Sequence, residues 1–124
     1  MTREVLIVDD AATVRLYHRS ILAKAGFDVT DAVNGYEGLE VALAKQFDLI
    51  MVDVNMPKMD GYTLVASIRA EGANRSTPVM MVTTEDSELD AARGYEAGAN
   101  AYLTKPVAGE QLSALANMLT ASQP

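Results

Sequence analysis

Runs of apolar residues alternate with longer amphipathic stretches along the whole chain. The runs at 5–8, 49–52 and 79–82 show no alternation with polar residues, which is typical of strands that are buried on both faces. Residues 27–32 do alternate and predict a weaker strand nearer to an edge of the sheet. A short fifth strand is predicted at 101–103.

Each predicted strand is followed by a stretch in which apolar residues recur at spacings of three and four, and this predicts a helix. The first helix covers 13–25 and the last 111–119, while the others centre on three apolar stripes: Leu39, Ala42 and Leu43; Leu64, Val65 and Ile68; Leu89, Ala92 and Ala97. Gly26 and Gly98 lie where the first and fourth helices end. Alternation of strand and helix predicts an α/β fold, a parallel sheet with helices on both faces.

Polar residues end four of the five predicted strands. Asp9 and Asp10 follow the first strand, Asp53 the third, Thr83 the fourth and Lys105 the fifth. In such sheets ligands bind outside the carboxyl ends of the strands. We therefore expect three carboxylates, a hydroxyl and an ammonium group to gather at one edge.

Clustered carboxylates repel one another unless one is protonated or a cation lies among them. Carboxylate oxygens on a shallow rim suit Mg²⁺, which also binds water and phosphate oxygens. Lys105 and Thr83 would add the positive charge and the donor that phosphoryl transfer needs. Asp53 is the natural nucleophile, forming an acyl phosphate, because the adjacent Asp9 and Asp10 look like the metal-binding pair.

The chain resembles the receiver domains of two-component response regulators, in particular the single-domain CheY-like receivers of chemotaxis. The resemblance extends from 5 to 119 and depends on four motifs in the order and spacing of that family: VDD at 8–10, DVNMPKMDG at 53–61, VT at 82–83 and KP at 105–106. It implies a flavodoxin-like (βα)₅ fold, doubly wound, with the strand order 2-1-3-4-5 characteristic of that fold.

The resemblance also implies the chemical roles. Asp53 would accept a phosphoryl group. Asp9 and Asp10 would form the acid pocket that binds Mg²⁺ together with Asp53, and the backbone carbonyl of Asn55 would be a further ligand. The domain would catalyse only its own phosphorylation and autodephosphorylation and would not be an enzyme acting on other substrates.

A second group of residues would carry the signal. Thr83 is implied as the switch hydroxyl, and Lys105 as the cation that pairs with the phosphoryl group. Tyr102 matches the aromatic switch residue, and the bond between Lys105 and Pro106 is expected to be cis. The output surface would be made of the fourth helix, the fifth strand and the fifth helix.

The implied partners are a sensor histidine kinase or a histidine phosphotransfer protein, a downstream target protein and a phosphatase. Asn55 and Glu85 match chemotaxis-type receivers, which favours chemotaxis. A phosphorelay intermediate and a receiver of another two-component pathway remain as alternatives. A receiver-like scaffold that is never phosphorylated is disfavoured, because the set of chemical groups for phosphorylation is complete.

Two unrelated functions share parts of this pattern. A flavodoxin-like electron carrier needs an anion-binding loop after the first strand, where this chain has Asp9 and Asp10. An aspartyl-phosphate hydrolase needs a second acid two residues after the nucleophile, and Asn55 occupies that position. Both are therefore disfavoured.

Composition narrows the partners further. The 124 residues include 10 Lys and Arg against 17 Asp and Glu, a net charge of −7, which argues against nucleic acid. Without cysteine the chain has no thiolate zinc site and no cysteine nucleophile. Its apolar runs are far shorter than the roughly 20 residues of a membrane span. We expect a cytoplasmic monomer without membrane insertion, one receiver domain over 1–124 with no output domain.

Four other residues invite a functional interpretation. His18 on the first helix is expected to be a packing residue, because the phosphohistidine donor belongs to a partner kinase. Asp60 is expected to cap the third helix. Met56 and Met59 flank the site and are candidates for contact with a partner.

Overall fold

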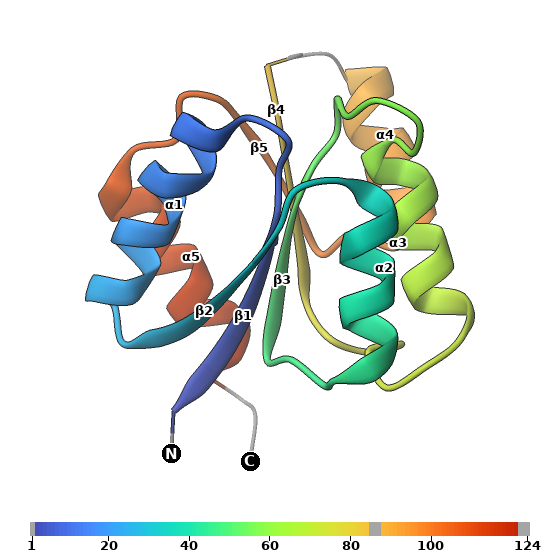
Figure 1. Ribbon diagram of the computed structural model, residues 1–124. Helices are drawn as coiled ribbons and strands as arrows, with labels where there is room; N and C mark the ends of the chain where they lie inside the picture. The colour runs from blue at the N-terminus through green and yellow to red at the C-terminus, as the bar shows by residue number, and fades with distance from the viewer. Residues whose placement is uncertain (1, 85–87, 122–124) are drawn as a thin grey trace.

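The computed structural model describes residues 2–84 and 88–121. In this part of the chain, strands and helices alternate strictly (Figure 1). The strands are β1 (Arg3–Val8), β2 (Phe27–Ala32), β3 (Leu49–Asp53), β4 (Val79–Thr83) and β5 (Ala101–Thr104). The helices are α1 (Ala12–Lys24), α2 (Gly35–Ala44), α3 (Gly61–Ala70), α4 (Glu88–Ala97) and α5 (Gly109–Thr120).

The strands form one parallel sheet in the order β2-β1-β3-β4-β5, so the flavodoxin-like α/β fold is confirmed. The alternating strand β2 lies at an edge, as its pattern predicts. Helices α1 and α5 cover one face of the sheet, and α2, α3 and α4 cover the other (Figure 1). No helix in the described part of the chain has the length and apolar character needed to cross a bilayer.

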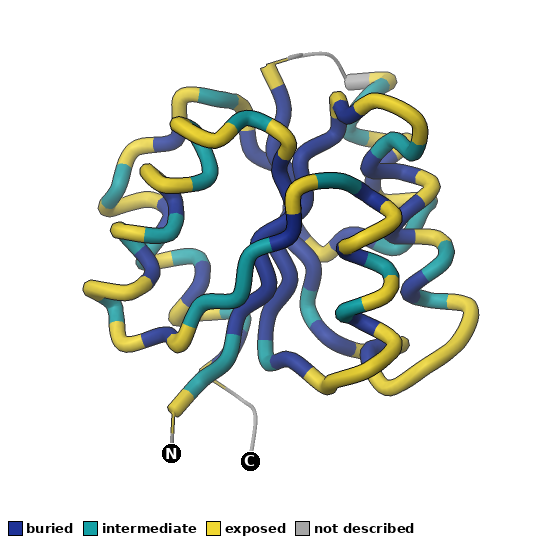
Figure 2. Tube along the Cα trace, viewed as in Figure 1, coloured by how far each residue is buried: buried dark blue, intermediate teal, exposed yellow. Residues whose placement is uncertain are grey.

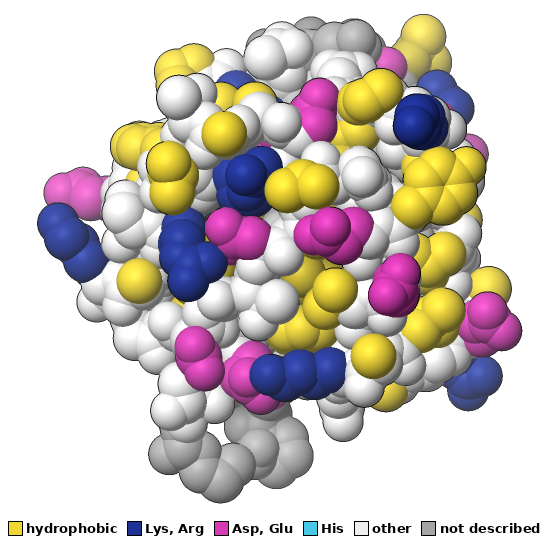
Figure 3. Space-filling view, in the orientation of Figure 1, with side chains coloured by type: hydrophobic (Ala, Val, Ile, Leu, Met, Phe, Trp, Pro, Cys, Tyr) yellow, Lys and Arg dark blue, Asp and Glu magenta, His cyan; other side chains and the backbone are white. Residues whose placement is uncertain are grey.

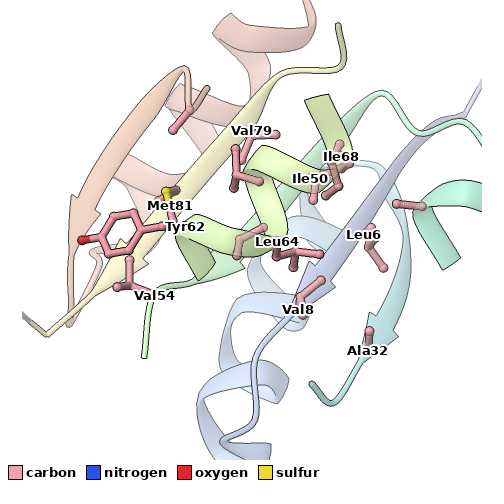
Figure 4. Close-up of a cluster of buried hydrophobic side chains, with 14 of the residues drawn as sticks. Leu6, Val8, Ala32, Ile50, Val54, Tyr62, Leu64, Ile68, Val79 and Met81 are labelled. Atoms are coloured by element: carbon pink, nitrogen blue, oxygen red, sulfur yellow. The ribbon is translucent and has the colours of Figure 1, made fainter. Parts of the chain in front are cut away.

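Both faces of the central strands are buried, which explains why their sequences do not alternate. On β1, Leu6 and Val8 join the cluster under α2 and α3, while Val5 and Ile7 join the cluster under α1 and α5. The middle of the sheet is accordingly buried throughout, whereas the helices are exposed on their outer sides (Figure 2). The first cluster surrounds Leu64 of α3 (Figure 4).

Local signals in the sequence set the helix ends. Helix α1 ends at Lys24, one residue before the predicted end, and Gly26 after it has a φ of +98°, a conformation that glycine adopts without strain. The Asp60 side chain accepts a hydrogen bond of 2.8 Å from the Thr63 backbone N–H, so its predicted role as the cap of α3 is confirmed.

Of the four residues singled out above, His18 and Met56 are both buried. His18 is only 2% exposed, which confirms it as a packing residue. The expectation that Met56 could contact a partner is wrong, because its side chain is buried in the cluster under α3 and Met59 packs against the same cluster. The chain after β3 turns back onto the sheet, with the Gly61 N–H donating to the Val54 carbonyl at 2.9 Å.

That turn leaves no room for a side chain at Gly61. A Cβ there would lie 2.5 Å from the carbonyl oxygen of Asp53 and 2.9 Å from the Cα of Val54. Gly61→Ala should therefore lower the free energy of unfolding by about 2–4 kcal/mol, measured by urea denaturation. In the matched variant Gly109→Ala the new Cβ would meet nothing closer than 3.6 Å, and we expect unchanged stability or a gain of up to about 1 kcal/mol. Equal effects of the two substitutions would contradict this reading of the turn.

Candidate functional site

The carboxyl ends of β1, β3 and β5 lie at the upper edge of the sheet in Figure 1, and the side chains found there meet around one ammonium group. Asp9 follows β1, Asp53 is the last residue of β3, and Lys105 follows β5. The Lys105 Nζ donates to Asp9 Oδ2 at 3.1 Å and to Asp53 Oδ1 at 3.0 Å. The Lys105 backbone N–H also donates to the Thr83 carbonyl at 2.6 Å. The lysine is thus held by its backbone while its side chain joins two carboxylates.

Three carboxylates share this position. Asp9 is 2% exposed and Asp53 is 6% exposed, whereas Asp10 faces solvent. One oxygen from each lies within 4.8 Å of the others. Such a set of hard oxygens, open to water on one side, fits Mg²⁺. Asn55, whose carbonyl is implied as a further ligand, lies exposed two residues after Asp53.

Burial is the largest single influence on the pKa of Asp53 and on that of Lys105. It raises the pKa of Asp53 from 3.8 to about 6; the Lys105 ammonium opposes this rise, and the neighbouring charges of Asp9 and Asp10 add to it. Burial lowers the pKa of Lys105, but the bonds to Asp53 and Asp9 outweigh burial, so this pKa lies above its ordinary value. Asp53 is therefore ionised near neutral pH but incompletely compensated, a state suited to accepting an electrophile.

Asp9 has further support that the sequence pattern does not reveal. Its Oδ1 accepts a hydrogen bond of 2.9 Å from the Ala11 backbone N–H. The Arg15 guanidinium donates to the Asp9 backbone carbonyl at 2.6 Å and lies 3.6 Å from Asp31 on β2. Arg15 thus holds the loop after β1 in place. The only signal for it in the sequence is a basic residue early in the first helix, which is too common to be diagnostic.

A second set of polar groups lies beside the acid cluster. Thr83 at the end of β4 is fully buried, and its Oγ1 accepts a hydrogen bond of 3.3 Å from Asn55 Nδ2. The hydroxyl of Tyr102 on β5 is 3.2 Å from the hydroxyl of Tyr62. Burial and then this bond raise the pKa of Tyr102 well above its ordinary value, and a hydrogen bond with Thr83 opposes the rise. Sequence reasoning missed Tyr62.

The loop after β5 borders a hollow next to Lys105. The bond between Lys105 and Pro106 is cis, as expected. The hollow has a volume of about 400 Å³ and is mainly apolar, lined by residues of α1 and of two loops: Thr13, Val14, Tyr17, His18, Thr84, Lys105, Pro106 and Val107. Glu85, which supports the chemotaxis interpretation, lies outside the described residues.

The surface does not offer a phosphate backbone a continuous basic face in the view of Figure 3. Acidic and basic side chains alternate there, with apolar side chains between them. Several of the basic groups are paired, including Arg19 with Asp31 at 2.6 Å and Lys45 with Glu4 at 2.5 Å.

Comparison with known proteins places this geometry in a family. The family model for the response regulator receiver domain matches residues 5–117. The chain is 38% identical over 109 residues to protein PilG of Pseudomonas aeruginosa, covering 88% of this chain and 81% of PilG. It spans less than half the length of several other curated relatives that it matches.

Solved structures agree. The chain is similar to chemotaxis protein CheY4 of Vibrio cholerae, with a TM-score of 0.91 and 35% identity over 96% of this chain and 99% of CheY4. It also resembles the receiver domain of sensor histidine kinase PA1611 from Pseudomonas aeruginosa, which has a magnesium ion coordinated in its active site cleft. That match has a TM-score of 0.91 and 27% identity and covers 98% of this chain and 100% of the other. The chain therefore belongs to the response regulator receiver domain family of two-component signalling.

Proposed function

We propose that this receiver domain is a phosphorylation-dependent switch that takes a phosphoryl group onto Asp53 from a histidine kinase or a histidine phosphotransfer protein. The observation that carries the proposal is the Lys105 ammonium between the buried carboxylates of Asp9 and Asp53, at 3.1 and 3.0 Å. An incoming phosphoryl group requires a nucleophile whose negative charge is only partly neutralised and a cation beside it.

In the proposed step a carboxylate oxygen of Asp53 attacks phosphorus. The new P–O bond forms while the P–N bond of the phosphohistidine breaks, and the imidazole departs with the electron pair. Lys105 is close enough to Asp53 to pair with the phosphoryl oxygens once the carboxylate becomes an ester-like acyl phosphate. Hydrolysis of that acyl phosphate by water, or with a phosphatase, would reset the switch.

The acid cluster would hold Mg²⁺ through Asp9, Asp10 and Asp53, with the backbone carbonyl of Asn55 as a further ligand. When bound, the ion would supply positive charge to the transferring phosphoryl group. Two observations support this assignment: the three carboxylate oxygens lie within 4.8 Å of one another, and the similar PA1611 receiver coordinates a magnesium ion in its cleft.

The output would be a change in the surface formed by α4, β5 and α5. Phosphorylation adds up to about 2 negative charges and strong acceptor oxygens, and Thr83 is the buried hydroxyl at the neighbouring strand end. Through its interaction with Tyr102, which lowers the pKa of that phenol, Thr83 would give the charge a route to the surface. A downstream protein would bind that surface, and the similarity to CheY4 favours a chemotaxis pathway.

Asp53→Asn should abolish phosphorylation by acetyl phosphate and by a cognate kinase, because the amide is not a nucleophile. The matched variant Asp28→Asn makes the same change at an exposed position of β2 and should be phosphorylated at the wild-type rate. Intact-protein mass spectrometry measures both. A normal yield in Asp53→Asn would show that another residue accepts the group.

The same substitution should change the pH dependence of stability. Asp53 has a pKa of about 6 in the folded protein against 3.8 ordinarily, so the folded state holds its proton more tightly than the unfolded state does. This contribution to stability is complete below about pH 4 and is lost as pH rises through 6. In metal-free buffer, Asp53→Asn should gain on the wild type as pH rises from 4 to 7, by about 2 kcal/mol. A difference in stability that stays constant across this range in denaturation experiments would argue against the raised pKa.

Thr83→Ala should separate chemistry from output. We expect it to be phosphorylated at Asp53 but to lose most of the gain in target affinity on activation, because the hydroxyl that links the phosphoryl group to Tyr102 is gone. Binding to the target is measured with and without beryllofluoride, a mimic of the phosphoryl group. Thr63→Ala, at an exposed position of α3, is the control. A full wild-type gain in Thr83→Ala would refute this route.

A further inference from the structure

Tyr62, the second residue of α3, links three elements that the switch depends on. Its hydroxyl donates to the backbone carbonyl of Asp90 on α4 at 3.2 Å and lies 3.2 Å from the Tyr102 hydroxyl of β5. The Arg93 guanidinium of α4 stacks on the Tyr62 ring at 4.4 Å, a cation–π contact. The ring lies beside Met81 and Val54, and its hydroxyl oxygen points out of the core cluster (Figure 4).

The hydrogen bonds around Tyr62 have a direction. A phenol has one proton, and Tyr62 gives its proton to the Asp90 carbonyl. Tyr102 is therefore the donor in the bond between the two hydroxyls. The influence of Thr83 on the Tyr102 phenol is that of a donor, since it lowers the pKa of Tyr102. The directed hydrogen bonds thus run from Tyr102 through Tyr62 to α4.

The ring of Tyr102 packs against α4, and this packing keeps its hydroxyl on the side of Tyr62. A Cβ on Gly94 of α4 would lie 2.9 Å from Cδ1 and 3.1 Å from Cε1 of Tyr102, and 3.3 Å from the Met81 sulfur. The ring therefore lies directly against the helix at its one glycine in the described middle of α4. Tyr102 is turned inward in this structure, with its ring on α4 and its hydroxyl 3.2 Å from that of Tyr62.

The direction of these hydrogen bonds determines which of them Tyr102 keeps when Thr83 turns to a phosphoryl oxygen. Thr83 has one proton, so it gives up its bond to Tyr102 when it donates to the new oxygen. Tyr102 then loses an accepted bond but keeps the bond that it donates to Tyr62. Without the Tyr62 hydroxyl, an inward Tyr102 would be left with a partly buried hydroxyl lacking both partners, which is unfavourable.

We propose that Tyr62 is a positioning residue of the switch: its hydroxyl holds Tyr102 inward when Thr83 has turned to the phosphoryl group, and ties that position to α4. The part played by the phosphoryl group rests on the proposed function, whereas the contact between the two tyrosines does not. Tyr62 acts through Tyr102 and touches neither the phosphoryl group nor Mg²⁺.

The test compares Tyr62→Phe with Tyr36→Phe, which removes the same hydroxyl from an exposed residue of α2. Protein labelled with ¹³C at tyrosine Cζ gives one NMR signal per tyrosine, and a soluble neutral gadolinium chelate broadens the signals of exposed rings. The Tyr102 signal is assigned by its absence in Tyr102→Phe. In metal-free, unphosphorylated protein we expect Tyr62→Phe to lower the inward-to-outward ratio of Tyr102 about fivefold, the equivalent of one net hydrogen bond of about 1 kcal/mol. Tyr36→Phe should leave it unchanged.

The second arm adds Mg²⁺ and beryllofluoride. Tyr102 should stay protected in the wild type, and the loss of protection in Tyr62→Phe should exceed that in the first arm, because Thr83 no longer bonds to Tyr102. Incorporation of phosphate from acetyl phosphate should be the same in both proteins. Failure of the wild type to bind beryllofluoride or to be phosphorylated would contradict the proposed function and leave the first arm to decide the role of Tyr62.

A double-mutant cycle in urea guards against a general structural effect. Tyr62→Phe, Tyr102→Phe and the double variant should show a coupling free energy, the second substitution costing less than it does alone. Additive losses, or a Tyr102 signal in Tyr62→Phe as protected as in Tyr36→Phe in both arms, would overturn the proposal.

Discussion

One ammonium group between two buried carboxylates organises the functional edge of this protein. Lys105 follows the edge strand β5 and contacts Asp53 at the end of the central strand β3 and Asp9 after β1. Two like charges that are nearly inaccessible to solvent would repel strongly in a poorly polarisable surrounding. The positive charge of Lys105 offsets this repulsion. It can do so only because β5 ends beside β4, close enough to the ends of β1 and β3 for the lysine side chain to reach both carboxylates.

The compensation is incomplete, and this gives the site its chemistry. Lys105 divides its charge between two carboxylates, and a third, Asp10, stands at the exposed side. The pKa of Asp53 stays raised to about 6 despite the lysine, chiefly because the carboxyl is buried. A site with surplus negative charge attracts a divalent cation and, once the cation is bound, a phosphoryl group. Stability is sacrificed locally for reactivity, as is common at functional sites.

In the proposed switch, the residues at the ends of β4 and β5 would convert that chemistry into a change of shape. Thr83 ends the strand between Asp53 and Lys105, so it is the hydroxyl next to the place where the new charge would form. Behind it, Tyr102 and Tyr62 extend the hydrogen bonds to the backbone of α4. The ring of Tyr102 lies against Gly94, which is the packing of an inward state. Activation would then adjust a populated equilibrium.

The sequence by itself determined the elements, the fold class and the members of the acid cluster. Unbroken apolar runs identify strands buried on both faces, and polar residues at their ends identify one edge, since parallel strands all end on the same side. Asp9, Asp53 and Lys105 could therefore be grouped before their contacts were known. The motifs that resemble receiver domains added the strand order and the roles.

Only the tertiary structure decided the contacts made across elements. Nothing in the spacing of Tyr62 and Tyr102, 40 residues apart, indicates that their hydroxyls meet, and Met56 reads as a surface residue until the loop after β3 is seen to fold back. Arg15 is likewise one ordinary basic residue until its guanidinium is found on the Asp9 carbonyl. Periodicity reports which face of an element is buried. The partner of a side chain on that face depends on how crossovers and loops set neighbouring elements against each other, and that is a property of the packed chain.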